Sequence, residues 1–199
     1  MTVHCIKMII GFTGRIAAGK ETVKSFLVQK GFRYVETSQV LKDELSRRGM
    51  EITRENMQDL GDELRARDGL GALMKLVLER IDYENNKNKH FILDSLRNAG
   101  EADYLRKQAN SFILIAVDAP QRLRFERILS RGKPHDPKTW EEFLLVDNRD
   151  YCDENNPHGQ QVKYCMERAD FMVINDDDKQ KAMKQIERIW KEIEKRENN

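Results

Sequence analysis

The sequence has few cysteines, and their spacing matches no common cysteine motif. Cys5, Cys152 and Cys165 are odd in number and far apart among the 199 residues. A secreted scaffold held by disulfides usually carries an even, closely spaced set. A structural zinc site usually draws on cysteines in pairs separated by two residues. We therefore expect three reduced thiols and a cytoplasmic protein.

The sequence also lacks a long hydrophobic run and an excess of charge of one sign. No stretch approaches the roughly 18 apolar residues typical of a membrane-spanning helix, so neither membrane insertion nor secretion is expected. The 35 basic and 34 acidic residues give a net charge of +1. Nucleic-acid-binding proteins usually carry a basic excess or stripe. We expect no nucleic-acid partner, although a local basic cleft for phosphate groups is compatible with this balance.

Short apolar runs alternate with helical patterns along the chain. The runs at 6–12, 32–36, 91–93, 112–117 and 171–174 predict five strands. The segments between them place apolar residues at helical spacing, as at Val23, Phe26 and Leu27. Strands without a polar face are typical of parallel sheets that are covered on both sides. The predicted fold class is α/β, with a five-stranded parallel sheet flanked by helices in three layers.

A glycine-rich motif follows the first predicted strand. Gly14, Gly19 and Lys20 match the pattern G-x4-G-K, at the start of a predicted helix. Glycines let backbone N–H groups approach phosphate oxygens closely, and a helix N-terminus adds unpaired N–H groups. Lys20 is the cation expected on the terminal phosphates of ATP; a glycine-rich turn without a ligand is the alternative. The loop residues predicted to bind ATP are Gly14, Arg15, Ile16, Ala17, Ala18, Gly19, Lys20, Glu21 and Thr22.

The position after Lys20 departs from the usual phosphate-loop pattern. A serine or threonine normally follows the lysine and holds Mg²⁺. Here Glu21 follows, and Thr22 comes one residue later. Glu21 either reaches Mg²⁺, directly or through water, or is an acid in the first turn of a helix. The residues alone leave both interpretations open, and Glu21 and Thr22 are both candidate metal ligands.

A second acidic residue follows the apolar run at 91–93. Asp94 lies at the predicted end of a strand, and Arg97 comes three residues later. In α/β folds, an aspartate at this end of a strand faces the crevice where ligands bind. Asp94 is therefore a further candidate for Mg²⁺, and Arg97 is a candidate for the phosphate of an acceptor. A turn-forming aspartate without a ligand is the alternative.

Several arginines fall within one predicted helix. Arg127 and Arg131 are four residues apart and hence on one helix face. We expect them to neutralise a migrating phosphoryl group, because phosphoryl transfer depends on positive charge around that group. For Arg122 and Arg124 a solvated basic face is the better interpretation. The segment at about 132–157 that follows has the size of a small lid, whose Arg149 would complete the site on closure.

Taken together, these motifs resemble those of the P-loop nucleoside and deoxynucleoside monophosphate kinases. The segment 91–97 is similar to their strand-aspartate-arginine segment, and the spacing of Arg127 and Arg131 is similar to their arginine pair. Phage-type deoxynucleoside monophosphate kinases and animal-type phosphomevalonate kinases are more similar at Glu21, because they carry an acid after the lysine.

The resemblance implies further site residues and regions. The segment 36–42 is similar to the acceptor-phosphate segment of adenylate-kinase-like enzymes, so Ser38 and Lys42 are expected to bind the acceptor, with Lys42 in place of an arginine. Asn175, after the last strand, is expected near the adenine, as in the related dephospho-coenzyme A kinases; part of an N-cap cluster for the next helix is the equal alternative. The implied fold is the three-layer P-loop NTPase fold, with a helical acceptor-binding insert at about 38–82 and a small lid at about 132–157.

The activity that this resemblance implies is ATP-dependent phosphoryl transfer to a small phosphorylated acceptor, most simply a nucleoside or deoxynucleoside monophosphate, with Mg²⁺ as cofactor. The implied catalytic residues are Lys20, Asp94, Arg127 and Arg131, and the implied acceptor ligands are Ser38, Lys42, Arg97 and Arg149. The enzyme alternative is a dephospho-coenzyme A kinase. The alternative of another class is an ATP-dependent switch or chaperone with a protein or RNA partner. We expect a monomer or a homodimer.

Overall fold

A five-stranded parallel sheet forms the centre of the computed structural model, which describes residues 7–81, 89–133 and 136–197. The sheet order is β2-β3-β1-β4-β5, and every neighbouring pair is parallel, as predicted. Cys5 and most of the polar segment 83–89 lie outside the described residues. The strands are β1 (Met8–Gly14), β2 (Arg33–Val35), β3 (His90–Leu93), β4 (Phe112–Asp118) and β5 (Phe171–Ile174).

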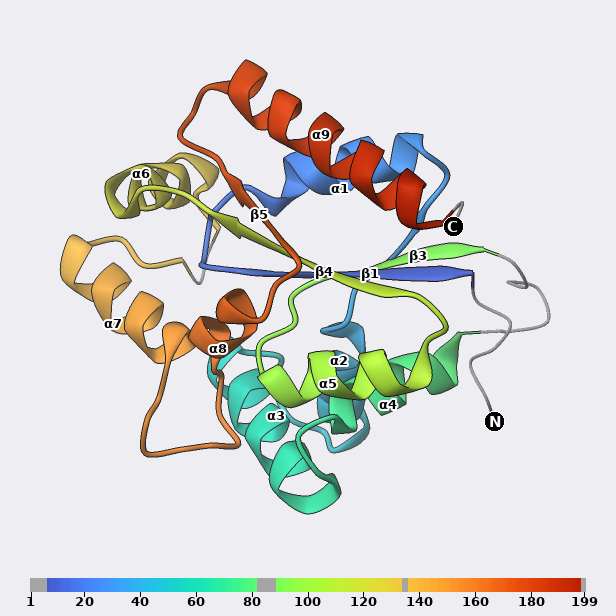
Figure 1. The fold of residues 1–199 in the computed structure, drawn as a ribbon. Helices are drawn as coiled ribbons and strands as arrows, with labels where there is room; N and C mark the ends of the chain where they lie inside the picture. The colour runs from blue at the N-terminus through green and yellow to red at the C-terminus, as the bar shows by residue number, and fades with distance from the viewer. Residues whose placement is uncertain (1–6, 82–88, 134–135, 198–199) are drawn as a thin grey trace.

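Helices cover both faces of the sheet (Figure 1). The helices in the described part of the chain are α1 (Lys20–Gln29), α2 (Gln39–Arg47), α3 (Arg54–Asp68), α4 (Ala72–Arg80), α5 (Ala99–Gln108), α6 (Gln121–Arg131), α7 (Trp140–Tyr151), α8 (Val162–Glu167) and α9 (Lys179–Glu197). Among these, none is both long and apolar enough to cross a membrane.

The side chains of β1 alternate between two hydrophobic cores. Met8, Ile10 and Phe12 face the core that α1 and α9 complete, whereas Ile9 faces the core built with α2, α3, α4 and α5. Figure 1 shows the same division, with α1 and α9 on one side of the sheet and α2 to α5 on the other. A strand that is buried on both faces carries mostly apolar side chains, which explains why apolar runs of the sequence located β1, β3 and β4.

Parallel strands bring their C-terminal ends to one edge of the sheet. The phosphate-loop motif follows β1, Asp94 follows β3 and α6 begins shortly after β4. Because β1 lies between β3 and β4 in the sheet, segments that are distant in the sequence meet at this edge. This is where ligands bind in open α/β sheets, and the residues of the candidate site gather here.

Candidate functional site

The loop between β1 and α1 has a backbone that only glycine allows at two positions. Gly14 has φ 134°, and a Cβ there would lie 2.0 Å from the carbonyl oxygen of Val117. Gly19 has φ 92°, and a Cβ there would lie 2.1 Å from Nδ2 of Asn175. L-residues with side chains rarely adopt such angles. The two glycines are thus required both by conformation and by close packing.

Arginines of α6 bind the carbonyl groups of this loop. Arg124 donates to the carbonyl oxygen of Ile16 at 3.3 Å, and Arg127 donates to those of Ala17 and Ala18 at 3.4 and 3.2 Å. Ala17 also has a positive φ of 58°. Alternation of right- and left-handed residues turns successive N–H groups to one side and forms an anion-binding concavity. The loop therefore has the support and the shape expected for phosphate binding.

Lys20 begins α1, and its ammonium group faces into the fold. Nζ lies 3.4 Å from the carbonyl oxygen of Gly14, and the side chain lines a small cavity of about 20 Å³. Burial lowers the pKa of Lys20 below the usual lysine range; the carboxylate of Asp94 opposes this shift, and the guanidinium group of Arg97 adds to it. An ammonium ion that has lost hydration and has a weak carbonyl partner is well placed to receive an anion.

Asp94 presents one unused carboxylate oxygen at this edge of the sheet. Oδ2 accepts a hydrogen bond from the hydroxyl group of Tyr34 at 3.1 Å. Oδ1 is buried and has no hydrogen-bond partner among the described residues. Mg²⁺ binds carboxylate oxygen and usually completes its coordination with water and phosphate oxygens. The chemistry of Asp94 therefore fits a Mg²⁺ that is shared with a bound nucleotide.

Glu21 is exposed in the first turn of α1. Its side chain is 72% exposed and forms an ion pair with Lys24 at 2.5 Å on the surface of α1. Thr22 is partly buried in the next position of the helix. No group of three or more His, Cys, Asp or Glu side chains with metal-site geometry occurs within residues 7–81, 89–133 and 136–197. In this arrangement Glu21 stabilises the N-terminus of the helix as an acid in its first turn.

A second, larger cavity of about 420 Å³ adjoins the small one. Its lining includes three of the predicted site residues, Ser38, Arg97 and Arg131, which come from the residue before α2, the turn after β3 and α6. One wall is apolar and comes mainly from α2, α3 and α4. The apolar residues of this wall are Leu41, Ile52, Met57, Leu73 and Met74.

The two cavities meet at the turn after β3. Ser95 and Arg97 line both of them. Ser95 has a φ of 62°, a left-handed conformation that costs energy for a residue with a side chain and is enriched at functional sites. The turn therefore lies between the space in front of Lys20 and the larger cavity.

The sequence analysis missed two charged residues at this place. Arg54, the first residue of α3, lines the larger cavity, and Asp150, near the end of α7, lines the smaller one. Asp150 accepts hydrogen bonds from Arg54, Arg97 and Gln58. No motif marks either residue. The local signal was limited to Thr53, which predicts that a helix starts at Arg54 and which caps α3 by accepting the N–H of Asn56.

Several predicted ligands lie elsewhere in this structure. Lys42 forms an ion pair with Glu36 at 2.5 Å and lies outside the lining of both cavities. The hydrogen bond from Lys42 is the main cause of the lowered pKa of Glu36. Arg149 forms an exposed ion pair with Asp59 at 3.2 Å. Their predicted contacts with an acceptor would require both side chains to leave these partners.

Arg127 faces Asn175 rather than the cavities. Its Nη2 donates to the Oδ1 atom of Asn175 at 3.0 Å and also reaches Asp177 at 3.3 Å. Arg131, one turn later, instead lies at the larger cavity and forms a two-point ion pair with Asp136 at 2.6 and 2.7 Å. The two arginines that the sequence placed together thus face different parts of the site.

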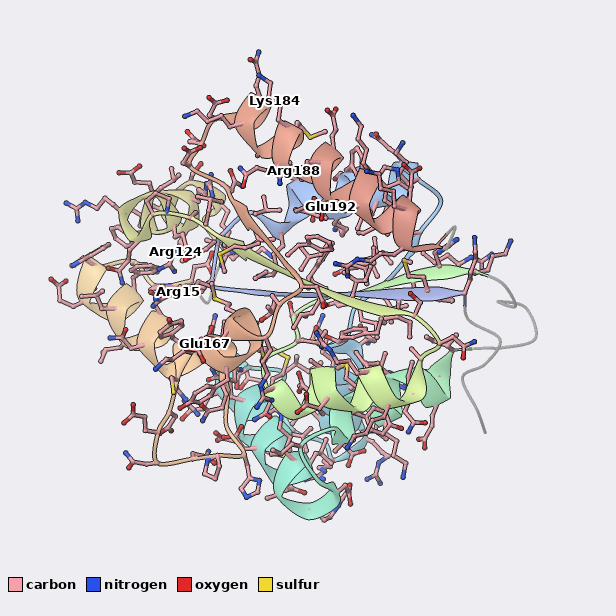
Figure 2. The ribbon with its side chains drawn as sticks, viewed as in Figure 1. Arg15, Arg124, Glu167, Lys184, Arg188 and Glu192 are labelled. Atoms are coloured by element: carbon pink, nitrogen blue, oxygen red, sulfur yellow. The ribbon has the colours of Figure 1, made fainter. Side chains whose placement is uncertain are left out.

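The interpretation of Arg124 as part of a solvated basic face was wrong. Its side chain is 1% exposed, and it donates to both carboxylate oxygens of Asp147, a residue of α7, at 2.5 and 2.8 Å. Arg15 of the phosphate loop donates to the same carboxylate at 3.2 and 2.6 Å. Arg15 and Arg124 lie near each other between α6 and α7 (Figure 2). Arg122, which is exposed beside Trp140, agrees with the prediction.

Comparison with known proteins identifies a family for most of this chain. The family model described as "AAA domain" matches residues 10–145. A UPF0200 protein of Thermococcus onnurineus is 30% identical over 188 residues, which cover 94% of this chain and 98% of that protein.

Solved structures share the fold at low sequence identity. TT1252 from Thermus thermophilus superimposes with a TM-score of 0.59 at 19% identity, over 95% of this chain and 98% of the other. A gluconokinase from Sinorhizobium meliloti gives a TM-score of 0.54 at 13% identity, over 96% and 97% of the two chains. At such identities the likeness supports the fold alone, which is that of the P-loop kinases.

Proposed function

The chain belongs to the AAA domain family and to the UPF0200 proteins, and on that premise we propose that it is an ATP-dependent phosphotransferase. Its acceptor is a small phosphorylated molecule, and a nucleoside or deoxynucleoside monophosphate fits best. The acceptor binds at the helical region of about 38–82, and the segment at about 132–157 closes over it.

The observation that carries this proposal is the meeting of two cavities at Ser95 and Arg97. One cavity contains Lys20 and adjoins the phosphate loop; the other is large enough for a small molecule, since ligand pockets have volumes of about 300–1,000 Å³. Phosphoryl transfer is mainly a matter of bringing donor and acceptor together in line. A donor site that opens next to an acceptor-sized cavity supplies this arrangement.

The residues around the donor site have complementary roles. The loop and Lys20 bind the phosphates of ATP, and Asp94 would hold Mg²⁺ together with those phosphates. When bound, Mg²⁺ supplies positive charge that neutralises the phosphate oxygens. Arg131 adds charge from the side of the larger cavity. Its ion pair with Asp136 fixes the orientation of this guanidinium group.

The larger cavity fits an acceptor with a phosphate group and an apolar, flat body. Arg54, Arg97 and Lys133 supply positive charge to it, while α3 and α4 supply a wall of aliphatic side chains and methionines. Sugars and sugar acids carry hydroxyl groups on all sides. Against this apolar wall those groups would be buried without hydrogen-bond partners, which costs free energy. A nucleobase would pack against it.

A phosphoryl-transfer screen tests the proposal. The purified chain is incubated with Mg²⁺, radiolabelled ATP and each of the common ribo- and deoxyribonucleoside monophosphates, with dephospho-coenzyme A, gluconate and buffer as comparisons. We expect transfer to at least one monophosphate and none in the Lys20→Ala variant. Transfer to dephospho-coenzyme A alone would make the acceptor a ribose hydroxyl. Slow hydrolysis that no acceptor stimulates would instead support a nucleotide-dependent switch.

A further inference from the structure

One carboxylate binds two arginines that line the larger cavity, which is the proposed acceptor cavity. The Oδ2 atom of Asp150 accepts hydrogen bonds from Nη2 of Arg54 and from Nη1 of Arg97, the latter at 3.2 Å. Its Oδ1 atom accepts Nε2 of Gln58 at 2.9 Å. The two arginines come from α3 and from the turn after β3, whereas Asp150 comes from α7. Three separate segments therefore converge on a single side chain.

Asp150 lies behind the two arginines as seen from the larger cavity. Arg54 and Arg97 belong to the lining of that cavity, and Asp150 does not. The side chain of Asp150 is 5% exposed, compared with 29% for Arg54 and 35% for Arg97. The carboxylate thus fixes two guanidinium groups that line the cavity, and Gln160 accepts a further hydrogen bond from Nη1 of Arg97 at 2.8 Å.

The charges of this cluster favour an anionic ligand. Two guanidinium groups that share one carboxylate retain one positive charge, and each guanidinium has five N–H donors of which the carboxylate occupies few. Two like charges held this close repel each other, so they would separate if the carboxylate between them were removed. A phosphate group offers several acceptor oxygens and binds arginine well in a two-point geometry.

We propose that Asp150 is a positioning residue that holds Arg54 and Arg97 as a paired receptor for the phosphate group of the acceptor. The inference rests on the proposed function for the nature of the acceptor. Asp150 does not touch the ligand; it acts through the orientation of the two arginines. The paired receptor also adds Arg54 to the acceptor site, although no motif in the sequence marks this residue.

The test measures phosphate binding in the absence of turnover. Inorganic phosphate is titrated into the full chain, with the nucleotide site saturated by a non-hydrolysable ATP analogue, and followed by phosphorus NMR. We expect the Asp150→Asn variant to bind phosphate about tenfold more weakly, as for the loss of a charge-assisted contact. The Asp150→Glu variant, which keeps the charge, should lose less. Unchanged or tighter phosphate binding by Asp150→Asn would overturn the proposal. It would mean that the carboxylate only competes with the phosphate for the two arginines.

A double-mutant cycle separates positioning from a structural effect. In an Arg54→Gln, Arg97→Gln background, Asp150→Asn should cause no further loss of phosphate binding, because its effect passes through these arginines. An equal loss in that background would contradict the inference. The Asn148→Ala variant, at an exposed position of α7, controls for a change in this helix that leaves the cluster intact. If Asp150→Asn does not fold, Arg54→Gln decides alone, because phosphate affinity that survives in this variant removes Arg54 from the receptor.

The outcome of the phosphate titration is independent of the outcome of the acceptor screen. Phosphate binding that depends on Asp150, in a chain that transfers no phosphoryl group, would refute the proposed activity and leave the paired receptor standing. Phosphoryl transfer whose acceptor KM is not raised in Asp150→Asn would refute the paired receptor and leave the proposed activity standing. For a transferred acceptor, we expect the variant to raise KM by about tenfold and to change kcat less.

Discussion

Asp147 and Asp150 lie three residues apart on α7, and each carboxylate accepts hydrogen bonds from two arginines of other segments. Residues at this spacing lie on the same face of a helix. The arginines of Asp147 belong to the phosphate loop and α6, whereas those of Asp150 line the acceptor cavity. One helix face thus fixes groups on both sides of the proposed reaction.

Removal of the Asp147 carboxylate is expected to destabilise the fold strongly. The Asp147→Asn variant removes the close counter-ion of the buried guanidinium group of Arg124 and leaves the more distant carboxylate of Asp118 at 3.9 Å. Breaking a buried pair costs about 3–5 kcal/mol. The free energy of unfolding from urea titration checks this value. The control is Arg149→Gln, whose ion pair with Asp59 is exposed and should contribute less than about 1 kcal/mol. Equal losses in the two variants would show that burial of the pair does not matter.

The contribution of Asp147 should also depend on pH. Burial alone would raise the pKa of Asp147, but hydrogen bonds and charge from Arg124 and Arg15 outweigh it and lower the pKa below the usual aspartate range. A carboxylate whose pKa is lower in the folded state stabilises that state above its unfolded pKa of about 3.9. This stabilisation is lost as the pH falls through the folded pKa. Urea titrations of the wild type and Asp147→Asn should therefore converge on acidification, and a constant difference down to strongly acidic pH would contradict the assignment.

ATP binding should weaken at alkaline pH because of Lys20. ATP binds the protonated ammonium group, and burial lowers the pKa of Lys20 in the free protein. Affinity should therefore fall as the pH rises through this lowered pKa, at a lower pH than for an ordinary lysine at about 10.4. Calorimetric titrations with ATP between pH 7 and 10, in steps of about one unit, measure the effect.

Two variants make this experiment specific. Lys20→Arg keeps its charge over the whole range and should show a flatter dependence, while Lys20→Ala should lose about tenfold or more in affinity at neutral pH. Lys30→Ala, at the other end of α1, is the matched control. An unchanged ATP affinity in a folded Lys20→Ala variant would refute the assignment of the loop.

Asp94 should determine the response of nucleotide binding to Mg²⁺. Its unpaired Oδ1 atom is the oxygen that would hold the metal or a metal-bound water. In the Asp94→Asn variant we expect Mg²⁺ to tighten ATP binding much less than in the wild type, with ATP affinity in EDTA preserved. Glu21→Gln is the comparison, since that carboxylate is exposed and paired with Lys24. A loss of the Mg²⁺ effect in Glu21→Gln, with no loss in Asp94→Asn, would assign the metal to Glu21 and not to Asp94.

The sequence was sufficient to predict the fold because its signals are local. The apolar runs marked all five strands, and the spacing of Gly14, Gly19 and Lys20 located the loop after β1. Such features depend on residues within one or two turns of each other.

The rest of the candidate site depends on contacts between distant segments. Arg54 and Asp150 are 96 positions apart and meet only through the packing of α3 against α7. Arg124 falls in a charged helix, and its burial follows from a carboxylate 23 positions away. Helix periodicity alone could not indicate either contact. The prediction for Arg149 rested on its place in the expected lid; in the structure its neighbour Asp150 lines the smaller cavity, and Arg149 forms an exposed ion pair with Asp59.

Loss of Arg131 should slow phosphoryl transfer while leaving ATP binding nearly unchanged. Its guanidinium group lines the acceptor cavity, and we propose that it stabilises the charge that develops during transfer. Removal of one such group typically costs about 100- to 1,000-fold in kcat. The measurements are kcat with the acceptor found in the screen and the Kd of ATP by calorimetry. Arg122→Ala, on the same helix but exposed beside Trp140, is the matched control and should retain wild-type turnover. A variant Arg131→Ala that loses only ATP affinity would place this arginine with the nucleotide and outside the transfer step.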